Sequence, residues 1–253
     1  MTEVSVIIPT YNRRLVIERA IKSVLNQTYN DYELIIVDDG SSDGTRELIQ
    51  EYAEKDKRIK YVYQENRGAS SARNFGIKQS LGEYLAFLDS DNEWLSDFLE
   101  TMVSVFKNRK SLLMAYCSEN LFLTSEDRDI NGKIIARRVR AEEYNPAKLL
   151  KTNYIDINCV ILKRELYDNL GGFDENLTSL EDWDYFARVA IAYPFSIRHV
   201  DTVLVNYYYS EGFDTITNKM MPKRAIRSYM GLAEPDELTR IVLSNIDKYL
   251  KDR

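Results

Sequence analysis

Several residue types that mark whole classes of protein are scarce in this sequence. Its 253 residues include two cysteines and one histidine, and Cys117 and Cys159 have neither CxxC spacing nor partners for a zinc site. Reduced, buried thiols in a cytoplasmic protein are therefore expected. No stretch approaches about 18 uninterrupted apolar residues, and a strand-like run has begun by Val4, so we expect no transmembrane helix and no signal peptide.

Positive charge is in short supply as well, with 34 Lys and Arg against 40 Asp and Glu and a net charge of −6. A dedicated nucleic-acid-binding protein usually has a basic surplus, so no nucleic-acid partner is expected. The apolar fraction of 44% and the charged fraction of 29% are ordinary for a soluble globular protein. A chain of this length buries about 75% of its unfolded surface, which is enough for a self-sufficient core.

Apolar runs alternate with amphipathic stretches through the first half of the chain. The runs expected to be strands are 4–8, 33–37, 59–63 and 84–88. Helical spacing of apolar residues follows these runs in the stretches 17–25, 48–53, 72–80 and 95–106. Strands alternating with helices predict βαβ units, a parallel sheet and right-handed crossovers.

After about residue 112 this alternation weakens. The polar stretch 125–145 carries the turn signal Asn131-Gly132 and predicts a hairpin or a mobile loop. A helix is expected from Trp183 to Ala192, and a helical tail interrupted near Gly231 and Pro235. The later strands are expected at 112–116, 159–162 and 200–208.

An Asp-x-Asp motif, Asp89-Ser90-Asp91, closes the apolar run 84–88. Side chains two positions apart in an extended chain point the same way, so both carboxylates would face one side. They repel unless a positive charge lies between them, and Mg²⁺ is typically held by one or two carboxylates plus substrate phosphates. Taken alone, the motif more often marks a solvated acidic turn.

Other polar groups fall at the carboxyl ends of the predicted parallel strands, where α/β proteins bind ligands. The first three strands end in Thr10-Tyr11-Asn12, Asp38-Asp39 and Gln64–Gly68. Tyr11 could stack on a base, Asp39 could accept from a base N–H or a ribose hydroxyl, and Arg73 could face a diphosphate. Their joint placement predicts a crevice for a nucleoside diphosphate with a metal ion.

Two other ligands fit these motifs poorly. The stretch Asp39–Gly44 imitates the start of an EF-hand loop, but its twelfth position is Gln50, and a strand precedes it where a helix is required. A nicotinamide-dependent dehydrogenase needs a glycine-rich turn after the first strand, and Pro9–Arg13 holds no glycine.

In combination and order, the motifs resemble family 2 glycosyltransferases, which are nucleotide-diphospho-sugar transferases with the GT-A fold. The matching segments, which span residues 4 to about 190, are VSVIIPTYNR (4–13), SVLNQTY (23–29), ELIIVDDGSSDGT (33–45), ENRGASSARNFGI (65–77), GEYLAFLDSDN (82–92), GGFDE (171–175) and EDWDYFAR (181–188). The resemblance implies an α/β protein, a single Rossmann-like GT-A domain with a mostly parallel central sheet and a C-terminal helical extension. The implied division is a glycosyltransferase domain (1–220), with a nucleotide-binding half (1–110) and an acceptor-binding half (111–220), followed by a helical tail (221–253).

The resemblance also implies the donor site and its cofactor, which in this family is Mn²⁺ or Mg²⁺ with a uridine- or thymidine-diphosphate donor. The implied donor-binding residues are Thr10, Tyr11, Asp39, Arg73, Asp89 and Ser90, and the implied metal ligands are Asp91 and Asp89. Many members carry a histidine after the last strand, but the corresponding stretch 206–210 has none, so a third protein ligand stays open. The lone His199 lies before that predicted strand and is expected to be structural.

The acidic pair Glu181-Asp182 gains a role from the same resemblance, because such a pair supplies the catalytic base in this family, most often through its second residue. In a single displacement at the anomeric carbon the acceptor hydroxyl loses a proton, so a carboxylate must lie within about 3 Å. One base and one metal suffice, and the anomeric configuration inverts. The alternative is that both acids merely favour a helix N-terminus, whose partial positive charge is expected to keep Asp182 ionised.

Two functions therefore stay open. The first is an inverting, metal-dependent hexosyltransferase that moves a sugar from a UDP-linked donor to a polysaccharide, glycolipid or glycoprotein acceptor; the alternative is a non-catalytic nucleotide-sugar-binding or scaffold domain. A hydrolase with two carboxylates is a distant third, since it needs neither metal nor nucleotide crevice. The tail, rich in Lys and Arg, either contacts anionic lipid at the inner face of the membrane or packs on its own domain or a second subunit of a homodimer.

Overall fold

The computed structural model describes residues 2–107, 109–124, 134–210 and 237–251. Within them a single nine-stranded sheet has the strand order β3-β2-β1-β4-β8-β6-β9-β5, with β7 paired to β6. The strands are β1 (Val4–Thr10), β2 (Tyr32–Asp38), β3 (Ile59–Tyr63), β4 (Tyr84–Phe87), β5 (Glu93–Trp94), β6 (Met114–Thr124), β7 (Ile134–Arg140), β8 (Val160–Lys163) and β9 (Ile197–Ser210). The helices are α1 (Ile17–Leu25), α2 (Thr45–Lys55), α3 (Ala69–Lys78), α4 (Phe98–Ser104), α5 (Pro146–Leu149), α6 (Arg164–Leu170), α7 (Glu181–Ala192) and α10 (Glu237–Lys251).

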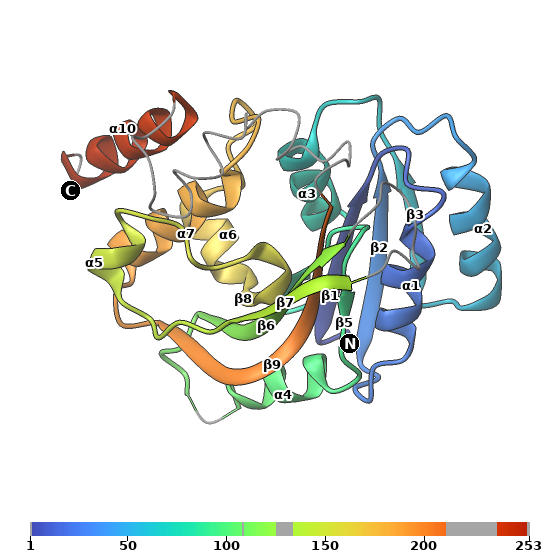
Figure 1. Ribbon diagram of the computed structural model, residues 1–253, viewed down its shortest axis with the longest axis horizontal. Helices are drawn as coiled ribbons and strands as arrows, with labels where there is room; N and C mark the ends of the chain where they lie inside the picture. The colour runs from blue at the N-terminus through green and yellow to red at the C-terminus, as the bar shows by residue number, and fades with distance from the viewer. Residues whose placement is uncertain (1, 108, 125–133, 211–236, 252–253) are drawn as a thin grey trace.

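The strands β3, β2, β1 and β4 are parallel, as the alternating sequence pattern predicts. All seven residues of β1 are buried, because helices cover both faces of this part of the sheet. Figure 1 shows α3 on the opposite side of these strands from α1 and α2. Thr10 pairs with Asp38 in the β1–β2 register, so the polar groups that follow these strands lie at one common edge.

A close approach between α3 and the sheet fixes the position of the helix. A Cβ at Gly76 would lie 2.7 Å from Ile7 Cγ2 and 3.1 Å from Val37 Cγ2, so no larger residue fits without movement. Because α3 packs so tightly on β1 and β2, Arg73, one turn earlier on the same helix, is held in the interior.

Antiparallel pairings gather in the second half of the chain, where β8 joins β4 to β6. The expected hairpin is confirmed, because β6 and β7 pair antiparallel, while the turn at Asn131-Gly132 lies outside the described residues. Strand β9 runs parallel to β6 with register shifts between Cys117 and Glu119, and Figure 1 shows it curving along the sheet. The fold is therefore the expected α/β domain, with parallel pairings among β1–β4 and again between β6 and β9.

Some element boundaries differ from the expectations. Helix α3 begins at Ala69 and α7 at Glu181, both earlier than the apolar spacing indicates, and α4 is confined to Phe98–Ser104. His199 lies within β9 rather than before it. Strand β6 extends well past residue 116 because polar side chains are buried there, and apolar patterning cannot detect them. These buried polar residues of β6 are Ser118, Glu119 and Asn120.

The C-terminal helix α10 packs on the rest of the domain. Val242 and Ile246 are buried, and α10 contacts α7. This is the packing that one of the two interpretations of the tail expects, whereas the interruption near Gly231 and Pro235 lies outside the described residues. Among the described helices, none combines the length and apolar character needed to cross a bilayer.

Candidate active site

The first carboxylate of the Asp-x-Asp motif is held from two sides. Asp89 accepts hydrogen bonds from Arg73 Nη2 at 2.7 Å and from Asn158 Nδ2 at 3.1 Å, and its backbone N–H donates to Asn158 Oδ1 at 2.6 Å. Ser90, between the two acids, is buried. The motif is therefore an ordered element of the strand end rather than a solvated turn.

The second carboxylate lies in a different electrostatic environment. Burial raises the pKa of Asp91, and the neighbouring charge of Asp89 raises it further, while Arg13 and Arg19 oppose both effects. Arg19 also donates to the Asp91 carbonyl and stacks on the Tyr208 ring, with its guanidinium carbon 3.8 Å from the ring centroid. Repulsion between two oxygen ligands at a strand end is what a hard divalent cation relieves, so these residues fit such an ion.

Arg73 joins the motif to the acidic pair of α7. Its side chain is 5% exposed, and it pairs with Asp89 at 2.7 Å and with Glu181 Oε1 at 2.5 Å. Burial alone would lower the pKa of Arg73, but the two carboxylates raise it above its usual value, so the guanidinium stays charged. Three segments distant in sequence thus meet at one buried cation.

The GGFDE segment is clamped onto the same helix as Arg73. Asn74 accepts from the Phe173 N–H and donates to the Phe173 carbonyl, each at 2.9 Å. A Cβ at Gly172 would lie 2.2 Å from Asn74 Oδ1, which explains the glycine at this position. The Arg73 guanidinium lies 5.8 Å from the Phe173 ring centroid. This segment therefore forms part of the wall around Arg73.

Glu181 and Asp182 differ in their partners. Glu181 is engaged with Arg73, whereas Asp182 Oδ2 accepts from Asn153 Nδ2 at 3.3 Å and its Oδ1 from the Trp183 N–H at 2.7 Å. Burial raises the pKa of Asp182 to about 8, helped by the charges of Glu181 and Asp156. The expectation that the helix N-terminus keeps this carboxylate ionised is therefore wrong at neutral pH, because burial and like charges outweigh the helix dipole.

Two of the expected nucleotide-binding residues, Thr10 and Tyr11, lie at the end of β1. The Thr10 hydroxyl is buried, with no hydrogen-bond partner in the described part of the chain, and Tyr11 is 47% exposed. A buried hydroxyl without a partner costs free energy unless a ligand satisfies it. These residues suit a ligand that brings both a polar group and a flat ring.

Asp39 has a structural task that the sequence does not reveal. It accepts from Gln64 Nε2 at 2.7 Å and from the backbone N–H groups of Arg67 at 2.8 Å and Gly68 at 2.9 Å. The carboxylate thereby ties the loop after β3 to the end of β2. An ionised carboxylate has about four acceptor positions, so one remains for a ligand.

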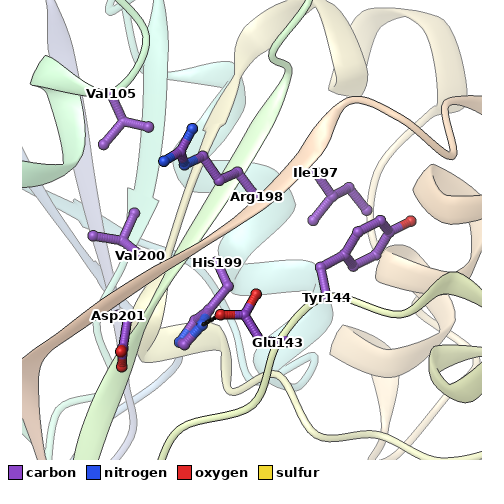
Figure 2. Close-up of a pocket in the computed structure, with 8 residues that line it drawn as sticks. All are labelled: Val105, Glu143, Tyr144, Ile197, Arg198, His199, Val200 and Asp201. Carbon is purple, nitrogen blue, oxygen red and sulfur yellow. Dashed lines mark ion pairs between the residues drawn. The ribbon is translucent and has the colours of Figure 1, made fainter.

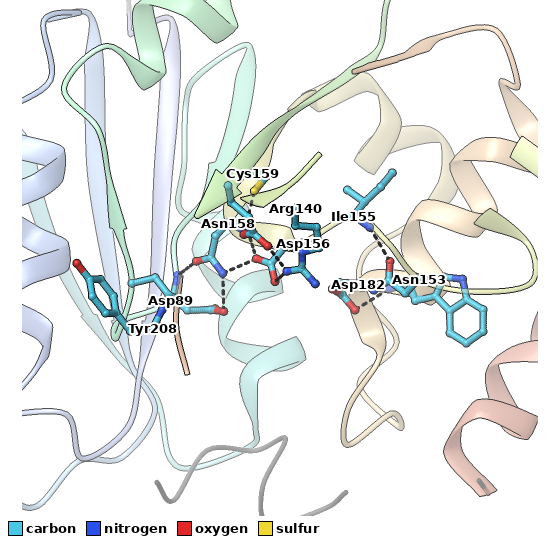
Figure 3. A network of polar contacts seen from close by, with 12 residues as sticks. Asp89, Arg140, Asn153, Ile155, Asp156, Asn158, Cys159, Asp182 and Tyr208 are labelled. Carbon is cyan, nitrogen blue, oxygen red and sulfur yellow. Dashed lines mark hydrogen bonds and ion pairs between the residues drawn. The ribbon is translucent and has the colours of Figure 1, made fainter. Parts of the chain in front are cut away.

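A polar network behind the Asp-x-Asp motif was not foreseen (Figure 3). Asp156 Oδ1 accepts from Asn158 Nδ2 at 2.6 Å, and Asp156 Oδ2 accepts from Arg140 Nη2 at 3.0 Å. Arg140 also pairs with Glu119, to which the Cys159 thiol donates at 3.2 Å. The members come from β6, β7 and the segment before β8, and no sequence motif joins residues so far apart.

Part of this network resembles a metal site in composition. The ligand atoms of Glu119, Asp156 and Cys159 all lie within 4.8 Å of one another. Burial and then the Asp156 charge raise the pKa of Glu119 to about 7, whereas Arg140 lowers it. Arg140 already neutralises two of the three groups, so this cluster is compensated within the protein.

The stretch 206–210, which lacks the histidine of many relatives, brings a tyrosine to the site instead. The Tyr207 ring centroid lies 5.9 Å from the Arg140 guanidinium carbon. Burial, followed by the charges of Asp156 and Asp91, raises the pKa of Tyr207 well above its usual value. Tyr207 therefore stays a neutral phenol beside these acidic groups.

A cavity of about 440 Å³ lies away from these residues (Figure 2). Its lining residues come from the start of β9, the stretch after α4 and the stretch before α5: Val105, Glu143, Tyr144, Ile197, Arg198, His199, Val200 and Asp201. His199 is buried, has Nε2 3.0 Å from Ser118 Oγ and lies against the Tyr116 ring, as a structural histidine would. The cavity and the acidic site are therefore separate features.

Arg73 thus joins the Asp-x-Asp motif to the acidic pair of α7 in one connected cluster of the α/β domain. The chain belongs to Glycosyl transferase family 2, whose family model matches residues 5–171. It is 49% identical over 166 residues to a putative teichuronic acid biosynthesis glycosyltransferase of Bacillus subtilis, covering 64% of this chain and 62% of that protein. It is 44% identical over 105 residues to a GalNAc(5)-diNAcBac-PP-undecaprenol β-1,3-glucosyltransferase of Campylobacter jejuni, covering 41% of this chain and 34% of that protein.

Solved structures share the fold at lower sequence identity. Residues 1–349 of Staphylococcus aureus TarS in complex with UDP-GlcNAc match with a TM-score of 0.64 at 21% identity, covering 99% of this chain and 73% of that one. A mannosyltransferase of Pyrobaculum calidifontis with GDP-Man and Mn²⁺ matches with a TM-score of 0.61 at 18% identity, covering 99% of this chain and 74% of that one. The chain spans 25% of an uncharacterized glycosyltransferase of Rickettsia bellii and 62% of the B. subtilis relative.

Proposed function

We propose that this protein is an inverting, metal-dependent hexosyltransferase that moves a sugar from a nucleoside-diphosphate donor to an acceptor hydroxyl. The observation that carries the proposal is the Arg73 bridge, which connects Asp89 to Glu181 through one buried guanidinium. A donor-binding carboxylate and the candidate base pair are thereby built into one rigid unit. Family membership supports the same reaction class.

The donor is proposed to bind along the carboxyl edge of β1, β2 and β4. Tyr11 stacks on the base, the Thr10 hydroxyl gains its missing partner there, and Asp39 accepts from the base or ribose with its remaining lone pair. Asp89 and Ser90 lie on the ribose side, and Arg73 faces the diphosphate. The UDP-GlcNAc complex of TarS supports uridine as the base.

The cation is proposed to be Mn²⁺ or Mg²⁺, held by Asp91 with Asp89 beside it. A divalent ion bound there supplies charge stabilisation for the leaving diphosphate without a proton. The Mn²⁺ complex of the P. calidifontis mannosyltransferase supports this choice. Asp91 meets the requirement because burial and the Asp89 charge make its uncompensated ionised form unfavourable.

Asp182 is proposed as the general base, because Glu181 is already committed to Arg73. A pKa of about 8 lies near the working pH, where a general base is most effective. The Asp182 carboxylate takes the proton of the acceptor hydroxyl as that oxygen attacks the anomeric carbon opposite the diphosphate. One displacement of this kind inverts the anomeric configuration.

The acceptor is proposed to be a glycan or a lipid-linked glycan that binds against residues 111–220, with the nucleotide in residues 1–110. The names of the B. subtilis and C. jejuni relatives support an acceptor in polysaccharide or lipid-linked oligosaccharide synthesis. In this proposal the reaction takes place within residues 1–220. The tail 221–253 stabilises the domain, because α10 packs on α7.

The test separates an enzyme from a non-catalytic nucleotide-sugar-binding domain. Purified protein is incubated with UDP-sugars and a panel of glycan acceptors, with Mn²⁺ or with excess chelator, and UDP release is measured. The proposal expects release that requires both acceptor and metal. Nucleotide-sugar binding by calorimetry without any release across the panel would favour the scaffold alternative.

A further inference from the structure

One short segment of the chain contacts both Asp182, the proposed base, and Asp89, the proposed donor-side carboxylate. It runs from Asn153 to Asn158, between α5 and β8, and its two terminal asparagines contact Asp182 and Asp89 respectively. In Figure 3 the segment extends from one acid to the other, with Asp156 between them. The two acids thus share a support that is independent of the Arg73 bridge.

The amide of Asn158 has only one orientation that satisfies its contacts. Its backbone N–H and its Nδ2 both donate to Asp156 Oδ1, at 2.9 and 2.6 Å, and its carbonyl accepts from Trp94 Nε1 at 2.8 Å. Its Oδ1 is thereby left for the Asp89 N–H and its second Nδ2 proton for Asp89 Oδ2. Asn158 is 0% exposed, so water cannot replace these bonds.

The amide of Asn153 is oriented in a similar way. Its Oδ1 accepts from the Ile155 N–H at 3.2 Å, which closes a side-chain turn and leaves Nδ2 facing Asp182 Oδ2 at 3.3 Å. A donor to a carboxylate stabilises the ionised form. The other charged groups that act on Asp182 are Glu181 on α7, Asp156 on the same segment and Arg73 on α3.

We propose that Asn153 and Asn158 are positioning residues that set the separation and orientation of the base and the donor-side carboxylate. The inference rests on the proposed function, and it assigns each asparagine a separate effect. Asn158 acts on donor binding through Asp89, and Asn153 acts on proton removal through Asp182. In-line displacement is sensitive to such placement, since a misplacement of about 1 Å can cost 10²-fold in rate.

Two matched variants separate these effects from general loosening. Asn153→Ser keeps an oxygen that can close the turn but removes the amide donor, and Asn158→Ala removes both bonds to Asp89. Asn158→Ser, which is neutral and lacks the amide donor, replaces Asn158→Ala if that variant does not fold. Asn145→Ala is the control, because it removes a hydrogen bond that caps α5 in the same part of the chain and touches neither acid.

Each variant is assayed for donor affinity by calorimetry with UDP-sugar and Mn²⁺, for the pH dependence of transfer, and for thermal stability. We expect Asn153→Ser to move the rising part of the pH–rate profile to higher pH by about one unit, with donor affinity unchanged. Asn158→Ala is expected to weaken donor affinity about tenfold, which is the value of one net hydrogen bond. The pH–rate profile should keep its position.

A shifted pH–rate profile in Asn153→Ser alone, together with weaker donor binding in Asn158→Ala alone, would support the proposal. Changes in both variants that match Asn145→Ala, or no change in either readout, would overturn it. Failure of the proposed function looks different, because the wild-type protein would then release no UDP with any acceptor.

Discussion

Arg73 and Glu181 lie 108 positions apart in sequence, and Arg73 Nη1 donates to Glu181 Oε1 at 2.5 Å in the interior. The same guanidinium holds Asp89, so the two acidic motifs of the chain are parts of a single charged assembly. This arrangement commits Glu181 to Arg73, and for that reason Asp182 is the proposed base.

Asp91→Ala is expected to lower transfer by roughly 10²–10³-fold, the scale seen when one stabiliser of transition-state charge is removed. Stability should change little. Burial and the Asp89 charge both raise the pKa of Asp91, so removing this carboxylate relieves its repulsion with Asp89. Steady-state rates with titrated Mn²⁺, together with thermal melting, check both parts. Full wild-type activity in excess chelator would contradict the assignment of a metal.

Tyr11→Ala and Asp39→Ala are expected to weaken UDP binding for different reasons. Tyr11 is 47% exposed, so its removal should reduce affinity without lowering the melting temperature. Asp39 accepts from two backbone N–H groups of the next loop, so its removal should reduce both affinity and stability. Calorimetry with UDP and thermal melting distinguish the two; unchanged affinity in both variants would place the base elsewhere.

The rate of transfer is expected to rise with pH through about 8, because burial and then Glu181 raise the pKa of Asp182 and the base must lose its proton. The stability effect has the opposite sign. The folded-state pKa lies above the value of about 3.9 for an unfolded Asp. The contribution of this group to stability is therefore present below the unfolded pKa and lost as the pH rises through about 8.

A pH–rate profile and a series of unfolding curves measure both slopes. Asp182→Asn should flatten the stability change in this range. A transfer rate that falls as the pH rises from about 6.5 to about 8.5 would contradict the assignment of the base.

The buried pair Asp184–Arg188 is expected to be structural. Both side chains are under 5% exposed, at 3% and 4%, and Arg188 also donates to the carbonyls of Leu170 and Gly172. Arg188→Leu leaves a buried carboxylate without its partner and should cost about 3–5 kcal/mol of unfolding free energy. Chemical denaturation tests this; the double variant with Asp184→Leu should recover part of the loss, and a neutral single variant would show that the pair is not needed.

The polar groups at strand ends were predictable because they follow apolar runs directly, as Thr10 and Asp89 do. Parallel strands that end at one edge must bring such residues together, whatever the details of packing. The early start of α7 was not predictable from apolar spacing, because its first turn carries Glu181 and Asp182 rather than core residues.

The residues that hold the site residues in position could not be predicted from the sequence, for a physical reason. Asn158, Asp156 and Arg140 act through hydrogen bonds whose partners lie on other strands, and a polar residue's partner cannot be inferred from its own neighbours in the chain. Similarly, the helix dipole suggested an ionised Asp182. The burial that raises the pKa of Asp182 arises only when α3, α7 and the segment before β8 pack together.

In the proposed reaction Asp182 removes the proton of the acceptor hydroxyl, while Tyr11, Thr10 and Asp39 bind the nucleotide of the donor. Asp182→Asn keeps the shape of the side chain but cannot take a proton, and Glu181→Gln is its matched neighbour. The direct measurement pairs the transfer rate with donor affinity for both variants. We expect Asp182→Asn to lower transfer by roughly 10²–10⁴-fold at unchanged donor affinity. Near wild-type transfer by Asp182→Asn would contradict it, and a loss confined to Glu181→Gln would move the base one residue back.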